Sequence, residues 1–387
     1  MNVVFISPYF PFNYFHFCSH LSHLGINVLG IDQMPFDHLH QPLRTSLKDY
    51  YRVNDLHNYH ELVQACDYFV NRHGPIHRLE SHNEHWLHTQ AKLASQFQIP
   101  GLNNDQIEKV KRKSEMKKVF HSAGLNPAKG DLVPTLDAAL QLSSKLGYPV
   151  MLKPDIGVGA FGCRKIHHEN ELKEFFNFKY AQDYLMEEFI HGDIYSFDGL
   201  VDRDGQIIFC TSHVYCAGIA EIVQGQLDQY YYSLRELPPE LEKIGRETVQ
   251  AYQVKERFFH FEYFYTHREK HFIPIEVNMR PPGGPTLDMC NYACDIDLYK
   301  WWAELIAGDT TKKSFNRKYH CMAICRRYKN SYAHTHDEIM DKGRGLIVHH
   351  ENAPSLFYAT MGDFFYIARS KDLEELFELQ RFIQKHR

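Results

Sequence analysis

The run RFFHFEYFYT at residues 257–266 is followed, after a polar turn, by HFIPIEVNMR at residues 271–280. Aromatic residues dominate the first run, and Phe, Ile and Val recur in the second, which predicts the two strands of one β-hairpin. The midpoint of Glu262 and Glu276 falls inside the turn, so the hairpin sets these carboxylates opposite each other on neighbouring strands. Directly opposed side chains share a sheet face about 5 Å apart.

Two more polar side chains belong to the same predicted face. Side chains alternate along a strand, so Asn278 and Arg280 project from the same face as Glu276. Two carboxylates and an amide oxygen repel one another unless neutralised, and such hard oxygen ligands suit Mg²⁺ that bridges nucleotide phosphates. The pattern therefore predicts Glu262, Glu276 and Asn278 as metal ligands.

The alternative without a functional site is a solvated hairpin face with a Glu/Arg cross-strand pair. Phe272 and Pro274 argue against it, because we expect them on the acidic face, where they make it less polar than an ordinary wet surface. Carboxylates buried there without a partner would cost several kcal/mol.

A second signal is PVMLKPDIGVGAFG at residues 149–162, an apolar strand that ends at Lys153 and runs into a glycine-rich loop. The ammonium group can lie along nucleotide phosphates while the loop lends backbone amides, since glycine lets the chain come close. Gly157 to Gly162 also spells a GxGxxG string, but a strand rather than a helix is expected after it, so a dinucleotide fingerprint is not supported. A plain glycine-rich hairpin loop remains the alternative.

Two weaker signals gain meaning only from their order along the chain. Lys113 lies in a charged segment predicted as one helix from Asn104 to Gly124, where a solvated charged face is the default reading. The run MEEFI at residues 186–190 alternates charge with apolar bulk, which suits a purine held through backbone groups and equally suits an ordinary edge strand.

Composition narrows the class of protein. The chain has 387 residues with a net charge of −5 and no polybasic tract, which favours two or three lobes and argues against nucleic acid as a partner. Nine scattered cysteines fit a reducing cytosol, and no signal peptide or membrane span is recognised. The many histidines form no HExxH motif, and Ser81 to Glu84 has the spacing of a helix capping box.

Taken in order, these segments resemble the ATP-grasp superfamily, especially its carboxylate-amine ligase and biotin-carboxylase-like branch, over about residues 1–310. The resemblance implies an α/β and α+β fold, in which a Rossmann-like parallel α/β domain precedes a two-lobed ATP-grasp fold. The expected parts are an N-terminal domain (1–105), a small lid subdomain (106–185), a large subdomain with the magnesium site (186–310) and a C-terminal α+β segment that completes it (311–387).

The resemblance also implies roles for single residues. It assigns ATP binding to Lys113, Lys153, Gly157, Gly159, Gly162, Glu187, Glu188 and Ile190, two magnesium ions to Glu262, Glu276 and Asn278, and catalytic roles to Arg280 and Lys153. There are two departures. Arg112 stands where the family usually has Asp, and Ile194 stands where a Glu often contacts the ribose, which leaves Asp193 or Asp198 as substitutes.

The implied function is an ATP-dependent, ADP-forming ligase that joins a small-molecule carboxylate to an amine through an acyl phosphate, with ATP and Mg²⁺, or Mn²⁺ in its place. The alternatives are an ATP-grasp kinase, a biotin-type carboxylase and an ATP-sensing protein with a silent site. We expect a cytoplasmic protein without a nucleic acid or membrane partner, with a homodimer left open. The substrate pockets would draw on the first domain, residues 214–232 and the C-terminal segment.

Overall fold

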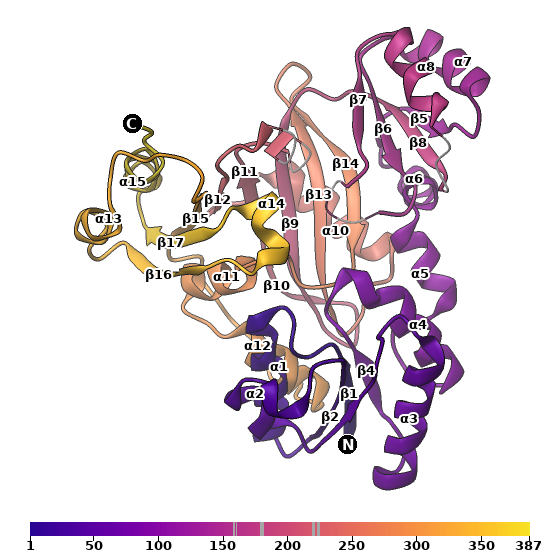
Figure 1. The fold of residues 1–387 in the computed structure, drawn as a ribbon, viewed down its shortest axis with the longest axis vertical. Helices are drawn as coiled ribbons and strands as arrows, with labels where there is room; N and C mark the ends of the chain where they lie inside the picture. Colours follow the sequence, from indigo (N-terminus) through magenta and orange to yellow (C-terminus); the bar gives the residue numbers. More distant parts are fainter. Residues whose placement is uncertain (158, 160, 179–181, 219–220, 223–224) are drawn as a thin grey trace.

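The computed structural model describes residues 1–387 apart from 158, 160, 179–181, 219–220 and 223–224. Two regions of interest, the glycine loop and residues 214–232, therefore lie partly outside the described residues. The strands form three sheets. Figure 1 shows the N-terminal sheet and the small sheet toward opposite ends of the long axis, with the large sheet between them. The expected α/β and α+β architecture is confirmed.

The N-terminal sheet is parallel, with the order β3-β2-β1-β4. Its strands are β1 (Asn2–Ile6), β2 (Asn27–Asp32), β3 (Asp49–Arg52) and β4 (Arg78–Glu80). The helices are η1 (Phe12–Tyr14), α1 (Phe15–His23), η2 (Phe36–His38), α2 (Gln41–Ser46), α3 (Tyr59–His73), η3 (Glu84–Trp86) and α4 (Leu87–Gln96). Every residue of β1 is buried, as expected for a parallel strand covered on both faces.

The small sheet is antiparallel, with the order β5-β8-β6-β7. Its strands are β5 (Gly130–Leu132), β6 (Val150–Pro154), β7 (Arg164–Ile166) and β8 (Tyr184–Glu188), and its helices are α7 (Leu136–Leu146) and α8 (Glu169–Asn177). The side chain of Thr135 caps α7 by accepting a hydrogen bond from the amide of Ala138, and Gly147 follows its last turn at φ +77°. These two residues set the ends of α7.

The large sheet has nine strands in the order β14-β13-β9-β11-β12-β15-β17-β16, with β10 paired to β9. They are β9 (Asp193–Val201), β10 (Ile207–Thr211), β11 (His213–Tyr215), β12 (Tyr230–Ser233), β13 (Arg257–Thr266), β14 (His271–Asn278), β15 (His320–Arg326), β16 (Ile347–Asn352) and β17 (Phe364–Ser370). The helices along this part are α10 (Pro239–Ala251), α11 (Thr286–Cys294), α12 (Leu298–Ile306), α13 (His336–Lys342), η4 (Ser355–Phe357), α14 (Tyr358–Met361) and α15 (Leu373–Ile383). The C-terminal strands thus extend the same sheet.

The two faces of the β13 end of this sheet belong to different cores. Phe259 and Phe261 point to the face that packs with α10. Phe258 points to the other face and packs with Phe17 of α1 and Trp302 of α12. Residues 258, 260 and 262 alternate onto that second face, so the predicted acidic face lies on the side of the N-terminal domain.

The predicted single helix from Asn104 to Gly124 is wrong. The structure has α5 (Asn104–Lys111) and α6 (Lys113–Ser122), separated by Arg112 in an extended conformation. Asp155 causes the break, because its carbonyl accepts from the amide of Lys113 and its carboxylate accepts from the amide of Ser114. These bonds supply the partners that the start of α6 lacks, and they fix Lys113 at its first position.

The predicted capping box at Ser81 and Glu84 is also wrong. The amide of Ser81 donates to the side chain of Gln90, and Asn83 caps η3 through the amide of His85. The carboxylate of Glu84 is instead bound by side chains from distant parts of the chain, described below.

The predicted domain boundaries at 105, 185 and 310 stay predictions, and β8 crosses the one at 185. No helix within the described ranges is long and apolar enough to cross a membrane.

Candidate functional site

The β13–β14 hairpin brings the two predicted carboxylates together. Glu262 lies directly opposite Glu276, and His260 lies opposite Asn278. The pairing expected from the sequence spacing is therefore confirmed. The two carboxylates share one sheet face with His260 and Asn278, because side chains two residues apart on a strand point to the same side.

The prediction that Phe272 and Pro274 share this acidic face is wrong. The register shifts by one residue between the pairs Glu262–Glu276 and Tyr263–Pro274, which leaves Ile275 as an extra residue. Such a bulge reverses which side chains share a face beyond it. Phe272 accordingly belongs to the apolar core on the opposite face.

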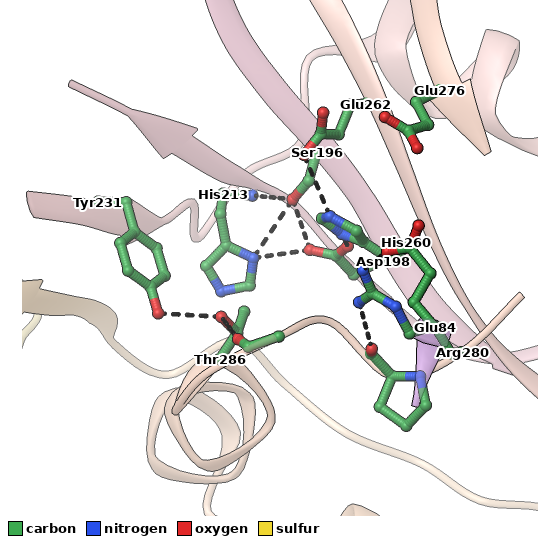
Figure 2. A network of polar contacts seen from close by, with 12 residues as sticks. Glu84, Ser196, Asp198, His213, Tyr231, His260, Glu262, Glu276, Arg280 and Thr286 are labelled. Carbon is green, nitrogen blue, oxygen red and sulfur yellow. Dashed lines mark hydrogen bonds and ion pairs between the residues drawn. The ribbon is translucent and has the colours of Figure 1, made fainter. Parts of the chain in front are cut away.

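The acidic face continues onto β9 and β11, where Asp198 collects three hydrogen bonds (Figure 2). Its carboxylate accepts from Ser196 Oγ at 2.5 Å, from His213 Nδ1 at 2.7 Å and from His260 Nδ1 at 2.5 Å. Burial alone would raise the pKa of Asp198, but the charge of His260 and the hydrogen bonds from both histidines hold it well below its usual range. Asp198 is therefore a buried anion.

His260 connects this anion to the predicted metal ligands. Burial by itself would lower the pKa of His260, but Asp198 and the hydrogen bond to Glu262 outweigh burial and raise it to about 9. Both ring nitrogens are protonated at neutral pH as a result. Nδ1 donates to Asp198, and Nε2 donates to Glu262 Oε1 at 3.3 Å.

The donor set fits a hard divalent cation. Asn278 Oδ1 is buried and has no hydrogen-bond partner among the described residues. Burial raises the pKa of Glu276, and nearby Glu84 and Glu262 raise it further against the opposing charge of Lys113. No cluster of three His, Cys, Asp or Glu side chains suited to a metal occurs in the described part of the chain, so Asn278 is needed to complete a three-residue set. An unpaired amide oxygen beside two crowded carboxylates is what Mg²⁺ would satisfy.

Three lysines of α6 and β6 form ion pairs with glutamates of the hairpin or of β8. Lys113 Nζ lies 3.8 Å from Glu276 Oε1. Lys153 Nζ lies 2.6 Å from one oxygen of Glu187, and Lys117 Nζ lies 2.5 Å from the other. Sequence reasoning missed Lys117, although its position one helical turn after Lys113 was the available signal.

The glycine loop follows Lys153 in the sequence, and Glu188 is the last residue of β8. Gly159 and Gly162 adopt φ values of +63° and +79°, which glycine adopts without strain, whereas Val158 and Ala160 lie outside the described residues. Glu188 accepts from the amide of Lys129 at 2.8 Å.

The remaining nucleotide positions are described but carry no contact that tests their role. Gly157 and Ile190 are both partly buried. Of the two substitutes for the ribose contact, Asp193 pairs with His267 at the exposed edge of the sheet, whereas Asp198 is engaged by the histidines. The nucleotide roles of all these residues stay predictions.

Arg280 is held by a residue from the N-terminal domain. Its Nη2 donates to Glu84 Oε2 at 2.5 Å and its Nη1 donates to the carbonyl of Pro281. The other oxygen of Glu84 accepts from Lys111 Nζ at 3.0 Å. Burial would raise the pKa of Glu84, but the charges of Arg280 and Lys111 and their hydrogen bonds hold it well below its usual range. Glu84 was missed as a site residue because its partner stands 196 positions away.

Comparison with known proteins agrees with this geometry. A model of the ATP-grasp domain matches residues 146–288. The L-arginine-specific L-amino acid ligase of Bacillus subtilis is 26% identical over 249 residues, 59% of this chain and 57% of that protein. The chain spans about half the length of the first curated relatives that it matches, 48% and 57%.

Solved structures match nearly the whole chain. An L-amino acid ligase from Bacillus licheniformis has a TM-score of 0.77 at 15% identity, over 98% of this chain and 96% of that one. The biotin carboxylase domain of a Hydrogenobacter thermophilus 2-oxoglutarate carboxylase, solved with MgADP and bicarbonate, has a TM-score of 0.69 at 16% identity, over 95% and 86%. The expected resemblance to the ATP-grasp superfamily is confirmed, because residues 146–288 match the model of its ATP-grasp domain.

Proposed function

We propose that this protein is an ATP-dependent ligase that joins a small-molecule carboxylate to an amine and releases ADP and phosphate. One observation carries the proposal. Glu262 and Glu276 lie opposite each other beside Asn278, whose buried oxygen has no partner among the described residues, and Lys113 approaches from α6. The names of the relatives, which include amino acid ligases and a biotin carboxylase, support the same class of reaction.

Glu262, Glu276 and Asn278 would hold two Mg²⁺ ions, with Mn²⁺ as a substitute. The metal would supply neutralisation of the crowded phosphate oxygens. His260 would keep Glu262 oriented while it donates to Oε1, since the ring is fixed from behind by Asp198.

The phosphate groups of ATP would meet Lys113 and Lys153. Both ammonium groups are currently near carboxylates, Glu276 and Glu187, so each is already aimed at the region between the small sheet and the hairpin. The backbone of Gly157, Gly159 and Gly162 would cover the terminal phosphate, with Glu187, Glu188 and Ile190 beside the adenine.

Arg280 would bind the carboxylate substrate. One carboxylate oxygen attacks the terminal phosphorus of ATP, the bond to the bridging oxygen breaks, and ADP leaves. The amine then attacks the acyl carbon, inorganic phosphate leaves, and the nitrogen gives up a proton. Positioned cations lower the barrier most where negative charge develops, which is the task of Lys153 and Arg280 here. Closure of the small lobe would keep water from the acyl phosphate.

Product analysis tests the proposal against its rivals. The ligase predicts that phosphate appears only when a carboxylate and an amine are both present, in equal amount to ADP and to the amide product. Phosphate retained on a hydroxyl product would indicate a kinase, and strict dependence on bicarbonate would indicate a carboxylase. Binding of ATP without turnover across pooled amino acids and other carboxylates would indicate a sensing protein.

The proposal also covers the partners, the oligomeric state and the cellular location of the protein. The acidic net charge and the absence of a polybasic tract support small-molecule partners rather than nucleic acid. A homodimer and a cytoplasmic location belong to the same proposal. Light scattering of the purified protein tests the first, and fractionation of cells tests the second.

A further inference from the structure

An open cavity of about 450 Å³ lies beside the connection between β11 and β12. Its walls come from three parts of the chain: that connection, the turn after β15, and the segment after α15. Its lining includes Cys216, Ala217, Leu227, Asp228, Asn330 and His386. Ligand sites in proteins commonly measure about 300–1,000 Å³, so a molecule of the size of an amino acid fits this cavity.

Two side chains from distant parts of the chain hold the wall on each side of Asp228. Arg327 Nε, directly after β15, donates to the carbonyl of Leu227 at 2.9 Å. Gln384 Nε2, directly after α15, donates to the carbonyl of Gln229 at 2.9 Å. The backbone before and after Asp228 is therefore fixed by hydrogen bonds, which keeps its side chain at the cavity.

Asp228 places a buried carboxylate in the wall of the cavity, with its side chain 8% exposed. Oδ1 accepts from the hydroxyl of Tyr332 at 2.7 Å and from Asn330 Nδ2 at 3.1 Å. Oδ2 is buried and accepts no hydrogen bond within the described ranges, although His386 Nε2 lies 3.1 Å away. An imidazole is a cation only when it is protonated. One oxygen of this buried carboxylate therefore lacks a permanent positive partner among the described residues, and a ligand cation would supply it.

Apolar groups line the cavity around this carboxylate. Leu227 is 47% exposed and Ala217 is partly buried, so both leave apolar surface open to the cavity. Tyr230 also lines the cavity, and its ring packs edge-on against Phe377 of α15. A ligand with an apolar stem would bury this surface while its charged end meets Asp228.

The sheet separates this cavity from the proposed metal site. Tyr231 points to the acidic face, where its hydroxyl forms a hydrogen bond with Thr286 (Figure 2). Side chains alternate along a strand, so Tyr230 points to the opposite face. Tyr215, which precedes Cys216, stacks on Tyr231 with the ring centroids 5.2 Å apart. A ligand in the cavity would thus lie behind the acidic face, next to residues whose neighbours in the chain belong to that face.

We propose that this cavity is a second binding site, which takes a small organic ammonium compound with Asp228 as its counter-ion. The ammonium group donates to Oδ2 of Asp228, and the apolar stem lies against Ala217, Leu227 and Tyr230. Binding there involves neither ATP nor the metal ligands, so the site does not depend on the ligase function. An amine effector and the amine acceptor of the proposed ligation share this chemistry, and turnover measurements separate the two sources.

Titration with n-butylammonium chloride tests the binding, with 1-butanol as the neutral probe and sodium butyrate as the anionic one. n-Butylammonium should bind at least about tenfold more tightly than either of the others. Asp228→Asn should remove this preference, since the amide keeps an acceptor for Tyr332 but loses the charge. Asp204→Asn is the matched control, because Asp204 is exposed in a turn. Equal affinity for the three probes, or an unchanged preference in Asp228→Asn, would overturn the proposal.

Cys216 reports where the probe binds, without any need for activity. It is exposed and lines the cavity, whereas the other cysteines are buried or half-buried. n-Butylammonium should slow the reaction of Cys216 with N-ethylmaleimide several-fold in the wild type but not in Asp228→Asn, and the labelled protein should no longer bind the probe. Mass spectrometry follows the labelling, and Cys216→Ser identifies the labelled position. An unchanged labelling rate at saturating n-butylammonium would refute the cavity as the site.

Turnover then separates the two sources of the ammonium group. An effector stays unmodified and changes the rate with another acceptor, and Asp228→Asn abolishes that change. An acceptor appears in the amide product, and Asp228→Asn raises the KM for the amine with little change in the KM for ATP. Binding that is lost in Asp228→Asn supports the site even if no ligation is found with any acid. Ligation without any binding of n-butylammonium that depends on Asp228 would refute the site and leave the ligase function standing.

Discussion

His260 Nε2 lies 3.3 Å from Glu262 Oε1, so a buried imidazolium holds one of the two opposed carboxylates of the hairpin. The other nitrogen of the ring is bound by Asp198. Among the described residues no hydrogen bond or ion pair joins Asp198 to Glu276 or Asn278, so we expect its effect on the proposed metal site to pass through His260. Residues that orient metal ligands in this way commonly change metal affinity by 10- to 100-fold when they are altered.

Asp198→Asn should therefore weaken the proposed metal site without removing a ligand. An amide cannot accept from both histidines and Ser196 as the carboxylate does, so His260 loses the charge that fixes it. We expect the Mg²⁺ concentration for half-maximal ATP turnover to rise about tenfold. Asp193→Asn is the matched control, because Asp193 lies on the same strand but at its exposed end. A folded Asp198→Asn protein with wild-type Mg²⁺ dependence would contradict the role.

Glu276→Gln tests the hairpin itself. The substitution keeps the shape of the side chain but removes the charge opposite Glu262, so ATP turnover should fall by about two to three orders of magnitude. The fold should stay intact, because burial and neighbouring carboxylates already oppose the charge of Glu276. Circular dichroism and thermal unfolding check the fold. Glu269→Gln in the turn of the hairpin should leave turnover unchanged, and normal turnover in Glu276→Gln would refute the metal assignment.

The sequence predicted this hairpin well, because cross-strand pairing follows from spacing within one short segment. The prediction failed where contacts between residues far apart in the sequence determine the local structure. The break at Arg112 depends on Asp155, 43 positions away, and the carboxylate of Glu84 is taken by Arg280 rather than by a local cap. The bulge at Ile275 changed the faces of Phe272 and Pro274, since one extra residue in a strand has no clear signature in the alternation of polar and apolar residues.

The pair formed by Glu84 and Arg280 gives a prediction about the carboxylate substrate. Glu84→Gln keeps a hydrogen-bond acceptor but removes the charge that orients the guanidinium group. We expect kcat/KM for the carboxylate substrate to fall at least about tenfold, while the KM for ATP changes little. Steady-state kinetics with each substrate varied in turn separates the two. An equal loss for ATP and carboxylate would show that Glu84 only supports the fold.

The substitution Arg280→Lys tests the proposed carboxylate site, and Arg268→Lys is its control. Arg268 lies in the exposed turn with its side chain 93% exposed, so the change there should have no effect. Arg280→Lys should reproduce or exceed the loss seen in Glu84→Gln, because an ammonium group cannot form the same paired hydrogen bonds. Activity of Arg280→Lys equal to wild type would remove Arg280 from the proposed carboxylate site.

The buried cluster of Arg78, Glu80 and Arg257 predicts how stability depends on pH. Glu80 Oε1 accepts from Arg78 at 2.9 Å and from Arg257 at 3.2 Å. Burial would raise the pKa of Glu80, but the two guanidinium groups lower it from 4.5 to about 2. The pKa of Glu80 is therefore lower in the folded protein than in the unfolded chain, and the ionised carboxylate stabilises the fold by about 3 kcal/mol above pH 4.5. This stabilisation is lost as the pH falls from about 4.5 to 2.

Glu80→Gln should remove this pH-dependent contribution. The difference in the free energy of unfolding between wild type and variant should be largest near neutral pH and should shrink below about pH 4.5, as the wild type becomes protonated at the same position. Urea unfolding at a series of pH values measures it. A difference that stays constant from pH 7 to pH 3 would show that the charge of Glu80 does not stabilise the fold.

Ligand-dependent stability tests the nucleotide and metal sites together. If Lys113, Lys153 and the hairpin bind MgATP, then ATP with Mg²⁺ at about 100 times its dissociation constant should stabilise the folded protein by about 2.7 kcal/mol. ATP with a chelator should give a much smaller shift in Tm, because the carboxylates of Glu262 and Glu276 then face the phosphates without a cation between them. Glu276→Gln should lose most of the extra shift caused by Mg²⁺ yet keep the shift caused by ATP alone, since the lysines remain. Equal shifts with and without Mg²⁺ in the wild type would mean that the nucleotide binds away from the hairpin.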